Sequence, residues 1–223
     1  MPPPNTLLKN LLTAILAFFS SLFNKPKEER RNGEKMKGEM EKGESPFCDP
    51  LENMKIRKNR ASNLFGVVRE NNTRNHQGFD YYAVPGTKIR AVADGVIKKI
   101  VNPANGDYGM QLVLKIDNTN YYAFYAHLSK IYDTIKLNTN VKKGEFLGET
   151  GNTGNAGKLK DDEQHLHFEC RTEIAPGLGL GGRLDPNLIV QTKFYTQNAN
   201  AIQTNIGVIK VDADGKETVM KVE

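Results

Sequence analysis

Hydrophobic and polar residues alternate in short runs through the middle of the chain, from about residue 48 to residue 190. Gly, Asn and Asp separate these runs, which is typical of short strands joined by tight turns. Residues 165–171 show the pattern most clearly, because their side chains alternate with the period of a strand. No run here has a convincing helical period, so we predict an all-β, antiparallel domain. The expected strands are 54–59, 64–68, 88–92, 96–101, 108–116, 121–126 and 165–171, and residues 141–148 are expected to form a turn and a short strand.

An apolar stretch dominates residues 1–23, with no charged residue between Lys9 and Lys25. It is shorter than the roughly 20 apolar residues of a membrane span, but it has the length of the hydrophobic region of a signal peptide. Positive charge before it is sparse, and no A-x-A cleavage site follows. We predict a signal-like or anchor-like segment over 1–23. A cleaved signal, an uncleaved or interfacial anchor that contacts a membrane through residues 7–23, and a helix docked on the protein's own core all stay open.

The segments on either side of the predicted domain differ from it in composition. Residues 24–44 are dense in mixed charge and contain only Met36 and Met40 as large apolar residues, so we predict a solvated linker over 24–47. The β-rich domain then covers 48–190. Residues 191–223 begin with Asn, Gln and Thr and continue as a β-hairpin, with expected strands at 206–211 and 217–222. The sequence does not indicate a role for this C-terminal extension.

Composition and charge narrow the picture only slightly. The chain has 223 residues, a net charge of +5 and a pI near 9.0. A basic protein suits an anionic surface such as a bacterial wall or a membrane, but the charges are dispersed and no nucleic-acid-binding motif accompanies them, so we expect no nucleic acid partner. The two cysteines, Cys48 and Cys170, are too few for a Cys-rich zinc site. They form either one disulfide or two free thiols.

The candidate chemistry lies in the histidines. The chain has only four, and all of them occur in short mixed polar and apolar motifs. His76 precedes Asp80 by four positions with Gly78 between them, and His165 precedes His167 by two. In a strand, residues at these spacings point to the same face. Two imidazoles and a carboxylate, with a fourth position left to water, are the ligand set of a catalytic zinc site.

Four histidines exceed what such a site needs, so some of them are expected outside the ligand set. A histidine beside the metal can act as a general base or stabilise an oxyanion. His127 is a candidate for this role, because it follows the aromatic strand 121–125 and packing would hold it in place. Each motif alone is weak evidence for a metal site. Together, however, the motifs contain every histidine in the chain, and this favours a metal site.

Several short motifs follow one another along the chain in the order that is typical of one protein family. Phe65-Gly66 with Arg69 resembles an F-G-x-R lead-in, with one extra residue, and His76-x-Gly78-x-Asp80 resembles H-x-G-x-D. Residues 85–96, 125–129 and 141–154 resemble the G-T…D-G-x-V hairpin, Y-x-H-L-S and V-x-x-G…G-x-T-G. Residues 165–169 read H-L-H-F-E, and Asp185-Pro186 follows. Over 65–188 the chain resembles the zinc metallopeptidases of lysostaphin/LytM type, peptidase family M23, which cleave bacterial peptidoglycan.

The resemblance implies a role for each candidate residue. His76, Asp80 and His167 would bind Zn²⁺, and His127 and His165 would be catalytic residues beside the metal. The reaction would be hydrolysis of a peptide bond in the stem peptide or cross-bridge of peptidoglycan, in the cell envelope, the periplasm or outside the cell. The implied fold is the duplicated-hybrid-motif peptidase fold, an antiparallel sheet groove with the metal on its floor. Its expected walls are 102–108, 151–162 and 176–183.

Some alternatives remain within the same fold. The chain could be a toxin that uses this chemistry against rival bacteria, or a catalytically inactive activator of other wall hydrolases. All five metal and catalytic positions are filled, which disfavours the inactive reading. In a latent form, Asn71, Asn72 or another side chain could block the fourth metal position. The sequence indicates no oligomeric state.

Overall fold

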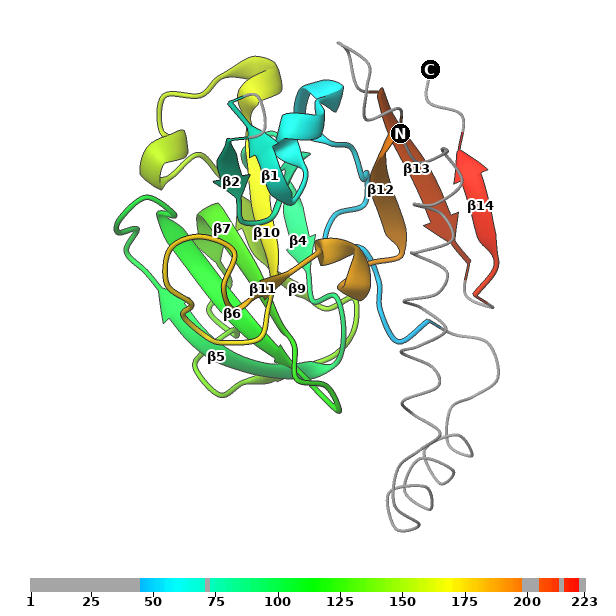
Figure 1. Cartoon of the computed structure of the whole chain (residues 1–223). Coiled ribbons are helices and arrows are strands. Elements are labelled where there is room, and N and C mark those ends of the chain that lie inside the picture. Colours follow the sequence, from blue (N-terminus) through cyan, green and yellow to red (C-terminus); the bar gives the residue numbers. More distant parts are fainter. Residues whose placement is uncertain (1–44, 71–72, 198–204, 213–214, 221–223) are drawn as a thin grey trace. The chain divides into compact units, whose positions relative to one another are not determined.

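The computed structural model describes residues 45–70, 73–197, 205–212 and 215–220 (Figure 1). The signal-like segment 1–23 and most of the linker 24–47 lie outside the described residues, as do Asn71 and Asn72. The strands are β1 (Gly66–Arg69), β2 (Arg74–His76), β3 (Phe79–Tyr82), β4 (Lys88–Arg90), β5 (Gly95–Val101), β6 (Met110–Ile116), β7 (Tyr122–Ile131), β8 (Asn140–Val141), β9 (Phe146–Thr150), β10 (His165–Arg171), β11 (Arg183–Leu184), β12 (Thr192–Gln197), β13 (Asn205–Val211) and β14 (Glu217–Met220).

Nine of these strands form one sheet, in which the central path runs β11-β10-β7-β6-β5-β8. β3 pairs with β10 beside β11, while β9 pairs with both β4 and β7. All strand pairs in the described residues are antiparallel, so the prediction of an all-β antiparallel domain is confirmed. The helices of the described residues are short 3-10 turns: η1 (Arg57–Asn59), η2 (Ala61–Asn63), η3 (Gly154–Ala156), η4 (Asp161–Glu163) and η5 (Pro186–Ile189). Within this part of the chain, no helix has the length and apolarity to cross a membrane.

One predicted strand, 54–59, is wrong. Ile56 makes a single bridge to Tyr81, and the 3-10 turn η1 follows. Lys58 and Asn59 have φ angles of 53° and 48°, which lie in the left-handed region. An extended ladder cannot continue through such residues. The chain therefore turns at this point, and Arg57 comes to lie beside residues of β3 and β10.

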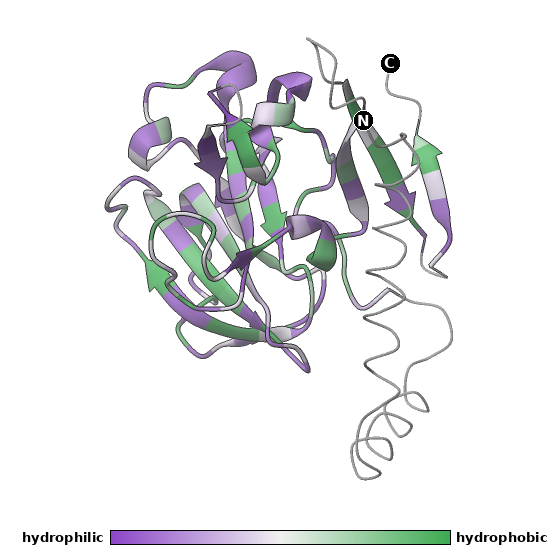
Figure 2. Cartoon of the chain, viewed as in Figure 1, coloured by the Kyte–Doolittle hydropathy of each residue, from purple (hydrophilic) through white to green (hydrophobic). Residues whose placement is uncertain are grey.

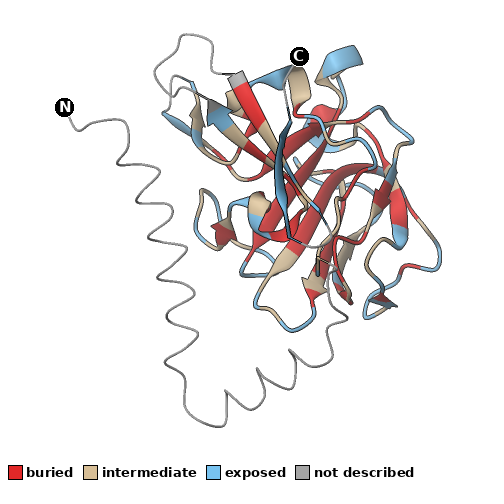
Figure 3. Cartoon of the chain, turned by 90° about the vertical axis from the view of Figure 1, so that its right-hand side faces the viewer, coloured by how far each residue is buried: buried red, intermediate tan, exposed pale blue. Residues whose placement is uncertain are grey.

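Strand β10 separates the apolar core from a polar layer. All seven of its residues are buried, so both faces of the strand are covered. Figure 3 shows that buried residues predominate on the strands inside the domain. Leu166, Phe168 and Cys170 belong to the main hydrophobic core. His165, His167 and Glu169 alternate with them and point to the opposite face, as the period of a strand requires. Figure 2 shows the same alternation of hydrophobic and hydrophilic residues along the strands of the sheet.

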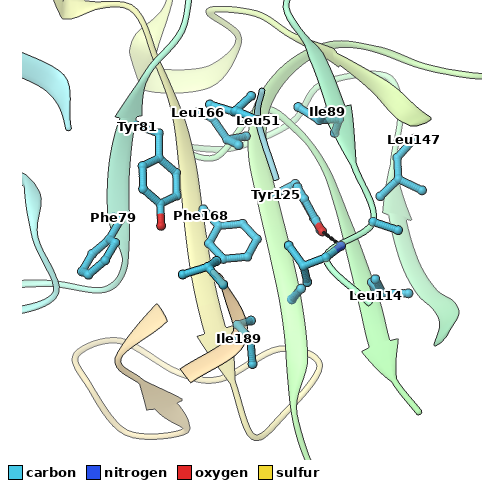
Figure 4. Close-up of a cluster of buried hydrophobic side chains, with 14 of the residues drawn as sticks. Leu51, Phe79, Tyr81, Ile89, Leu114, Tyr125, Leu147, Leu166, Phe168 and Ile189 are labelled. Carbon is cyan, nitrogen blue, oxygen red and sulfur yellow. Dashed lines mark hydrogen bonds between the residues drawn. The ribbon is translucent and has the colours of Figure 1, made fainter. Parts of the chain in front are cut away.

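Aromatic side chains fill the centre of the core (Figure 4). The rings of Tyr125 and Phe168 meet edge to face, with centroids 5.1 Å apart. The Tyr125 hydroxyl donates to the Arg90 carbonyl at 3.0 Å and accepts from the Val92 amide at 3.1 Å. A fully buried Tyr hydroxyl needs such partners, because an unpaired one would cost free energy. These bonds fix β7, which carries His127, against the segment that follows β4.

The three-stranded sheet β12-β13-β14 shares this core. Phe194 and Ile206 are buried among the core residues. The carboxylate of Asp49 accepts hydrogen bonds from the Gln191 amide at 2.9 Å and from the Thr192 amide and hydroxyl at 2.8 and 2.6 Å. β13 and β14 form an antiparallel hairpin where the sequence predicts one. The two cysteines of the chain are both free thiols.

Candidate functional site

The register of three neighbouring strands brings the predicted site residues together. On β10, His167 lies directly opposite Asp80 of β3 on one side and opposite Ala126 of β7 on the other. His127 follows Ala126, and His165 precedes His167 on the same face of β10. Directly opposed residues in antiparallel strands have Cβ atoms about 5 Å apart. Pairing alone therefore places the carboxylate beside the β10 imidazole.

Gly78 allows His76 to join them. A Cβ on Gly78 would overlap the carbonyl oxygen of Phe168 and lie 2.9 Å from the Glu169 Cγ. Only glycine lets the chain between β2 and β3 lie so close to β10. His76, at the end of β2, then lies with its Nε2 atom 3.1 Å from Asp80 Oδ1.

Three side chains converge with the chemistry of a metal site. The ligand atoms of His76, Asp80 and His167 lie within 4.8 Å of one another. His167 Nδ1 is 2.8 Å from Asp80 Oδ1. The other nitrogen of each imidazole is occupied, since His76 Nδ1–H donates to the Leu64 carbonyl at 2.8 Å and His167 Nε2–H donates to Glu169 Oε1 at 3.0 Å. The nitrogens that face Asp80 are therefore the ones free to coordinate, and this donor set fits zinc.

Two arginines hold the other oxygen of Asp80. Asp80 Oδ2 lies 2.7 Å from Arg69 Nη2 and 3.1 Å from Arg57 Nη2. Burial would raise the pKa of the Asp80 carboxyl, but the neighbouring side chains of His76, His165 and His167 keep it well below its usual value. Asp80 is therefore an anion with one oxygen turned toward the histidines.

His127 occupies a bulge in β7. Between the pairs Met110–Leu128 and Leu112–Tyr125, one residue of β6 lies opposite two residues of β7. One of these two is His127, which has a φ of 59°. A bulge re-aims a side chain, and a left-handed histidine is uncommon and strained. His127 Nδ1–H donates to the Thr153 carbonyl at 2.9 Å, and its ring centroid is 5.0 Å from that of His165. Burial, together with the charges of His167 and His165, lowers the pKa of His127 to about 3.

His165 is held in the same way. Its Nδ1–H donates to the Glu163 carbonyl at 2.9 Å, and its Nε2 is 3.7 Å from Asp80 Oδ1. Burial is the main cause of a lowered pKa for this imidazole. In both His127 and His165 a carbonyl fixes the proton on Nδ1 and leaves the Nε2 lone pair free. A neutral imidazole of this kind can accept a hydrogen bond or a proton at Nε2.

The structure also places residues at the site to which the sequence analysis gave no role. Glu169 is fully buried and joins His167 to Arg171 and Arg183, whose Nε atoms lie 2.6 and 2.7 Å from Glu169 Oε2. Its place on the histidine face of 165–169 is a signal that could have identified it. Tyr108, at the end of the expected wall 102–108, has its ring centroid 5.4 Å from that of His167. Burial and the neighbouring Glu169 raise the pKa of Tyr108 to about 12.

Arg57 is a further such residue, because its segment was expected to be a strand. Its Nη1 lies 3.5 Å from Glu163 Oε2 and 3.5 Å from His165 Nδ1. The adjacent Lys58 pairs with Glu163 and lies 3.5 Å from Asp162 Oδ1. These contacts tie η1 to η4 directly beside the histidines.

The expected walls lie around this cluster. Thr153 of the 151–162 segment contacts His127, and the Asn155 amide donates to the Asp107 carbonyl at 2.9 Å, so two of the walls adjoin. A Cβ on Gly179, in the third wall, would lie 3.6 Å from the amide of Asn75 beside His76. The five candidate residues of the cluster are at most 5% exposed, so the cluster lies well below the surface.

Comparison with known proteins finds a family model whose match includes this cluster. Residues 74–179 match the family model described as Peptidase family M23. The chain is similar to glycyl-glycine endopeptidase ALE-1 of Staphylococcus capitis, with 30% identity over 138 residues, which are 61% of this chain and 34% of that protein. It is also similar to DD-carboxypeptidase/endopeptidase Mpg of Neisseria meningitidis serogroup B, with 37% identity over 103 residues, or 46% of this chain and 21% of that protein.

Among solved structures, the chain is similar to the catalytic domain of the antimicrobial peptidase lysostaphin from Staphylococcus simulans. The identity is 26% and the TM-score 0.43, over 56% of this chain and 85% of that one. The chain spans about a third or less of the length of the two curated relatives above.

Proposed function

We propose that this chain, whose residues 74–179 match the model of peptidase family M23, is a zinc-dependent endopeptidase that hydrolyses peptide bonds of bacterial peptidoglycan. The observation that carries the proposal is the convergence of His76 Nε2 and His167 Nδ1 on Asp80 Oδ1, at 3.1 and 2.8 Å. Hydrogen bonds to Leu64 and Glu169 occupy the opposite nitrogens. This arrangement leaves these three residues to hold Zn²⁺.

The chain's own groups provide for proton transfer. Zinc, when bound, supplies a Lewis acid that polarises a carbonyl and acidifies water. Beside it, His165 and His127 each keep a proton on Nδ1 through a backbone carbonyl. The free Nε2 of such an imidazole can take the proton from the attacking water and return it to the leaving amine. The burial of both rings excludes bulk water, which strengthens their electrostatic effect on developing charge.

The substrate class comes from the relatives. ALE-1 is named a glycyl-glycine endopeptidase and Mpg a DD-carboxypeptidase/endopeptidase. We propose that the substrate of this chain is a peptide of peptidoglycan, either in the stem or in the cross-bridge. Such a substrate lies outside the cytoplasmic membrane, so the protein would act in the cell envelope or outside the cell.

The test is direct. The purified full-length chain, loaded with zinc, is incubated with peptidoglycan of stem-linked and glycine-bridged types, and the fragments are identified by mass spectrometry. New amino termini within one type of peptide are expected, and H165A, which keeps the metal ligands, should release none. Intact peptidoglycan of both types after treatment with a chain that contains stoichiometric zinc would contradict the proposal.

A further inference from the structure

Glu169 connects the proposed metal ligand His167 to a glycine-rich loop. One oxygen of its carboxylate accepts from His167 Nε2–H at 3.0 Å. The other accepts from Arg183 Nε–H at 2.7 Å. The Glu169 and Arg183 side chains are 0% and 3% exposed. A charge-assisted contact of this kind is short and strongly directional. His167, Glu169 and Arg183 therefore form a continuous buried chain of hydrogen bonds.

Arg183 uses its other end to hold the loop. Its Nη1 donates to the carbonyl of Gly177 at 2.7 Å, to that of Gly179 at 3.0 Å and to that of Gly181 at 3.4 Å. Residues 176–182, here called the glycine-rich loop, thus wrap around one guanidinium. The loop lies beside β2, since a Cβ on Gly179 would be 3.6 Å from the Asn75 amide.

The loop has little apolar packing of its own to hold it in place. Leu178, at its tip, is 99% exposed. A segment that buries little apolar surface opens at low free energy unless polar contacts hold it. Within the part of the chain that the structure describes, backbone bonds anchor it only near the C-terminal end, from the Thr172 amide to the Gly182 carbonyl at 2.9 Å and from the Arg183 amide to the Leu180 carbonyl at 3.1 Å. The order of the loop therefore depends on Arg183.

We propose that Arg183 is a positioning residue that couples the glycine-rich loop to the metal site, so that metal binding at His167 orders the loop. The inference rests on the metal site proposed above. An imidazole that coordinates through Nδ1 becomes a stronger donor at Nε2, which favours the carboxylate orientation in which Glu169 also holds Arg183. Because coupling is reciprocal, an intact loop also strengthens metal binding.

Hydrogen exchange with mass spectrometry tests the coupling on the full-length chain, with and without Zn²⁺. In the wild type, zinc should slow exchange of the amides of residues 177–182 by about tenfold, within the range of typical couplings. In R183K the ammonium keeps a charge beside Glu169, but it cannot also reach the loop carbonyls as a forked guanidinium does. R183K should bind one zinc, and its loop should respond to zinc by less than about twofold.

R171Q is the matched control. Arg171 also donates to Glu169 Oε2, at 2.6 Å, but its Nη1 reaches the Ile174 carbonyl at 3.3 Å, outside the glycine-rich loop. R171Q should keep the zinc response of the loop. R183Q is the second variant, and it should lose the response while β7 and β10 stay protected from exchange.

Three results would overturn the coupling: a wild-type loop that exchanges equally with and without zinc, an unchanged zinc response in R183K and R183Q, or an equal loss of the response in R171Q. Metal analysis of the same samples separates this inference from the proposed function. A wild type that binds no zinc refutes the metal site and the coupling together. A wild type that binds zinc without any change in the loop refutes the coupling alone.

Discussion

His127 adopts a backbone conformation that is unfavourable for any residue other than glycine, with a φ of 59° inside a strand. The bulge turns its ring toward His165. Strain of this kind persists only where the surrounding structure holds it, and it is common at active sites. His127 is held by its bond to Thr153 and by burial, and burial also keeps its imidazole neutral. The strained backbone of His127 thus holds a neutral imidazole beside His165.

A first prediction concerns the pH dependence of stability in the metal-free chain. His127 titrates near 6.5 when unfolded and at about 3 when folded. Between these values the unfolded chain binds more protons, so the stability from neutral His127 is complete above pH 6.5 and is lost as pH falls toward 3. H127Q cannot titrate and should show a shallower loss of stability between pH 6.5 and 4, measured by urea unfolding. Parallel curves for the two proteins would refute the lowered pKa.

At the residue scale, the histidines and Asp80 can be identified from the sequence, because motif spacing and the period of a strand relate residues that are close in the chain. The same strand period could also have identified Glu169. Arg57 was not, because it lies 108 positions before His165 and meets it only through the fold. Arg183 lies in the expected wall 176–183, but no local pattern encodes its contact with Glu169.

At the element scale, the β3-β10-β7 arrangement sets the geometry of the site. The register opposes His167 to both Asp80 and Ala126, so a shift by one residue would send every site side chain to the other face. Turn residues made most of these strands predictable. The end of β7 was not, because the bulge at His127 lets the strand continue to Ile131 beyond the expected end at Ala126. The strand expected over 54–59 failed because its left-handed residues carry no distinctive sequence signal.

A second prediction tests the close approach at Gly78. Alanine there would overlap the Phe168 carbonyl and separate β3 from β10. We expect G78A to lose about 3 kcal/mol or more of unfolding free energy, and to lose zinc affinity because His76 moves. G181A is the control, since a Cβ there meets nothing within 4 Å. Chemical denaturation that finds the two variants equally stable would show that the approach is not tight.

At the scale of the whole molecule, the C-terminal three-stranded sheet is part of the fold that supports the site. Phe194 contacts the aromatic cluster, with its ring centroid 6.4 Å from that of Phe79 and 5.9 Å from that of Tyr81. Phe79 and Tyr81 flank Asp80 on β3. The sequence predicts the β13–β14 hairpin from its turn, but not this packing, because contacts between distant segments leave no periodic signal.

A third prediction tests this packing. F194A should lower the free energy of unfolding by roughly 3–5 kcal/mol, because it leaves a cavity in the core. V219A, on the same sheet, should change it by no more than about 0.5 kcal/mol, since Val219 is 65% exposed. Denaturant unfolding that finds F194A as stable as V219A would mean that the sheet does not contribute to the core.

We assign the histidines to two roles, metal binding and proton transfer. The zinc content of five purified variants tests this assignment most directly. We expect one zinc per chain in the wild type, H127A and H165A, because His127 and His165 lie outside the ligand set. We expect a large loss of zinc in H76A, D80A and H167A, because each removes one of three ligands. Stoichiometric zinc in H76A or H167A, or loss of zinc in H127A and H165A, would contradict the assignment.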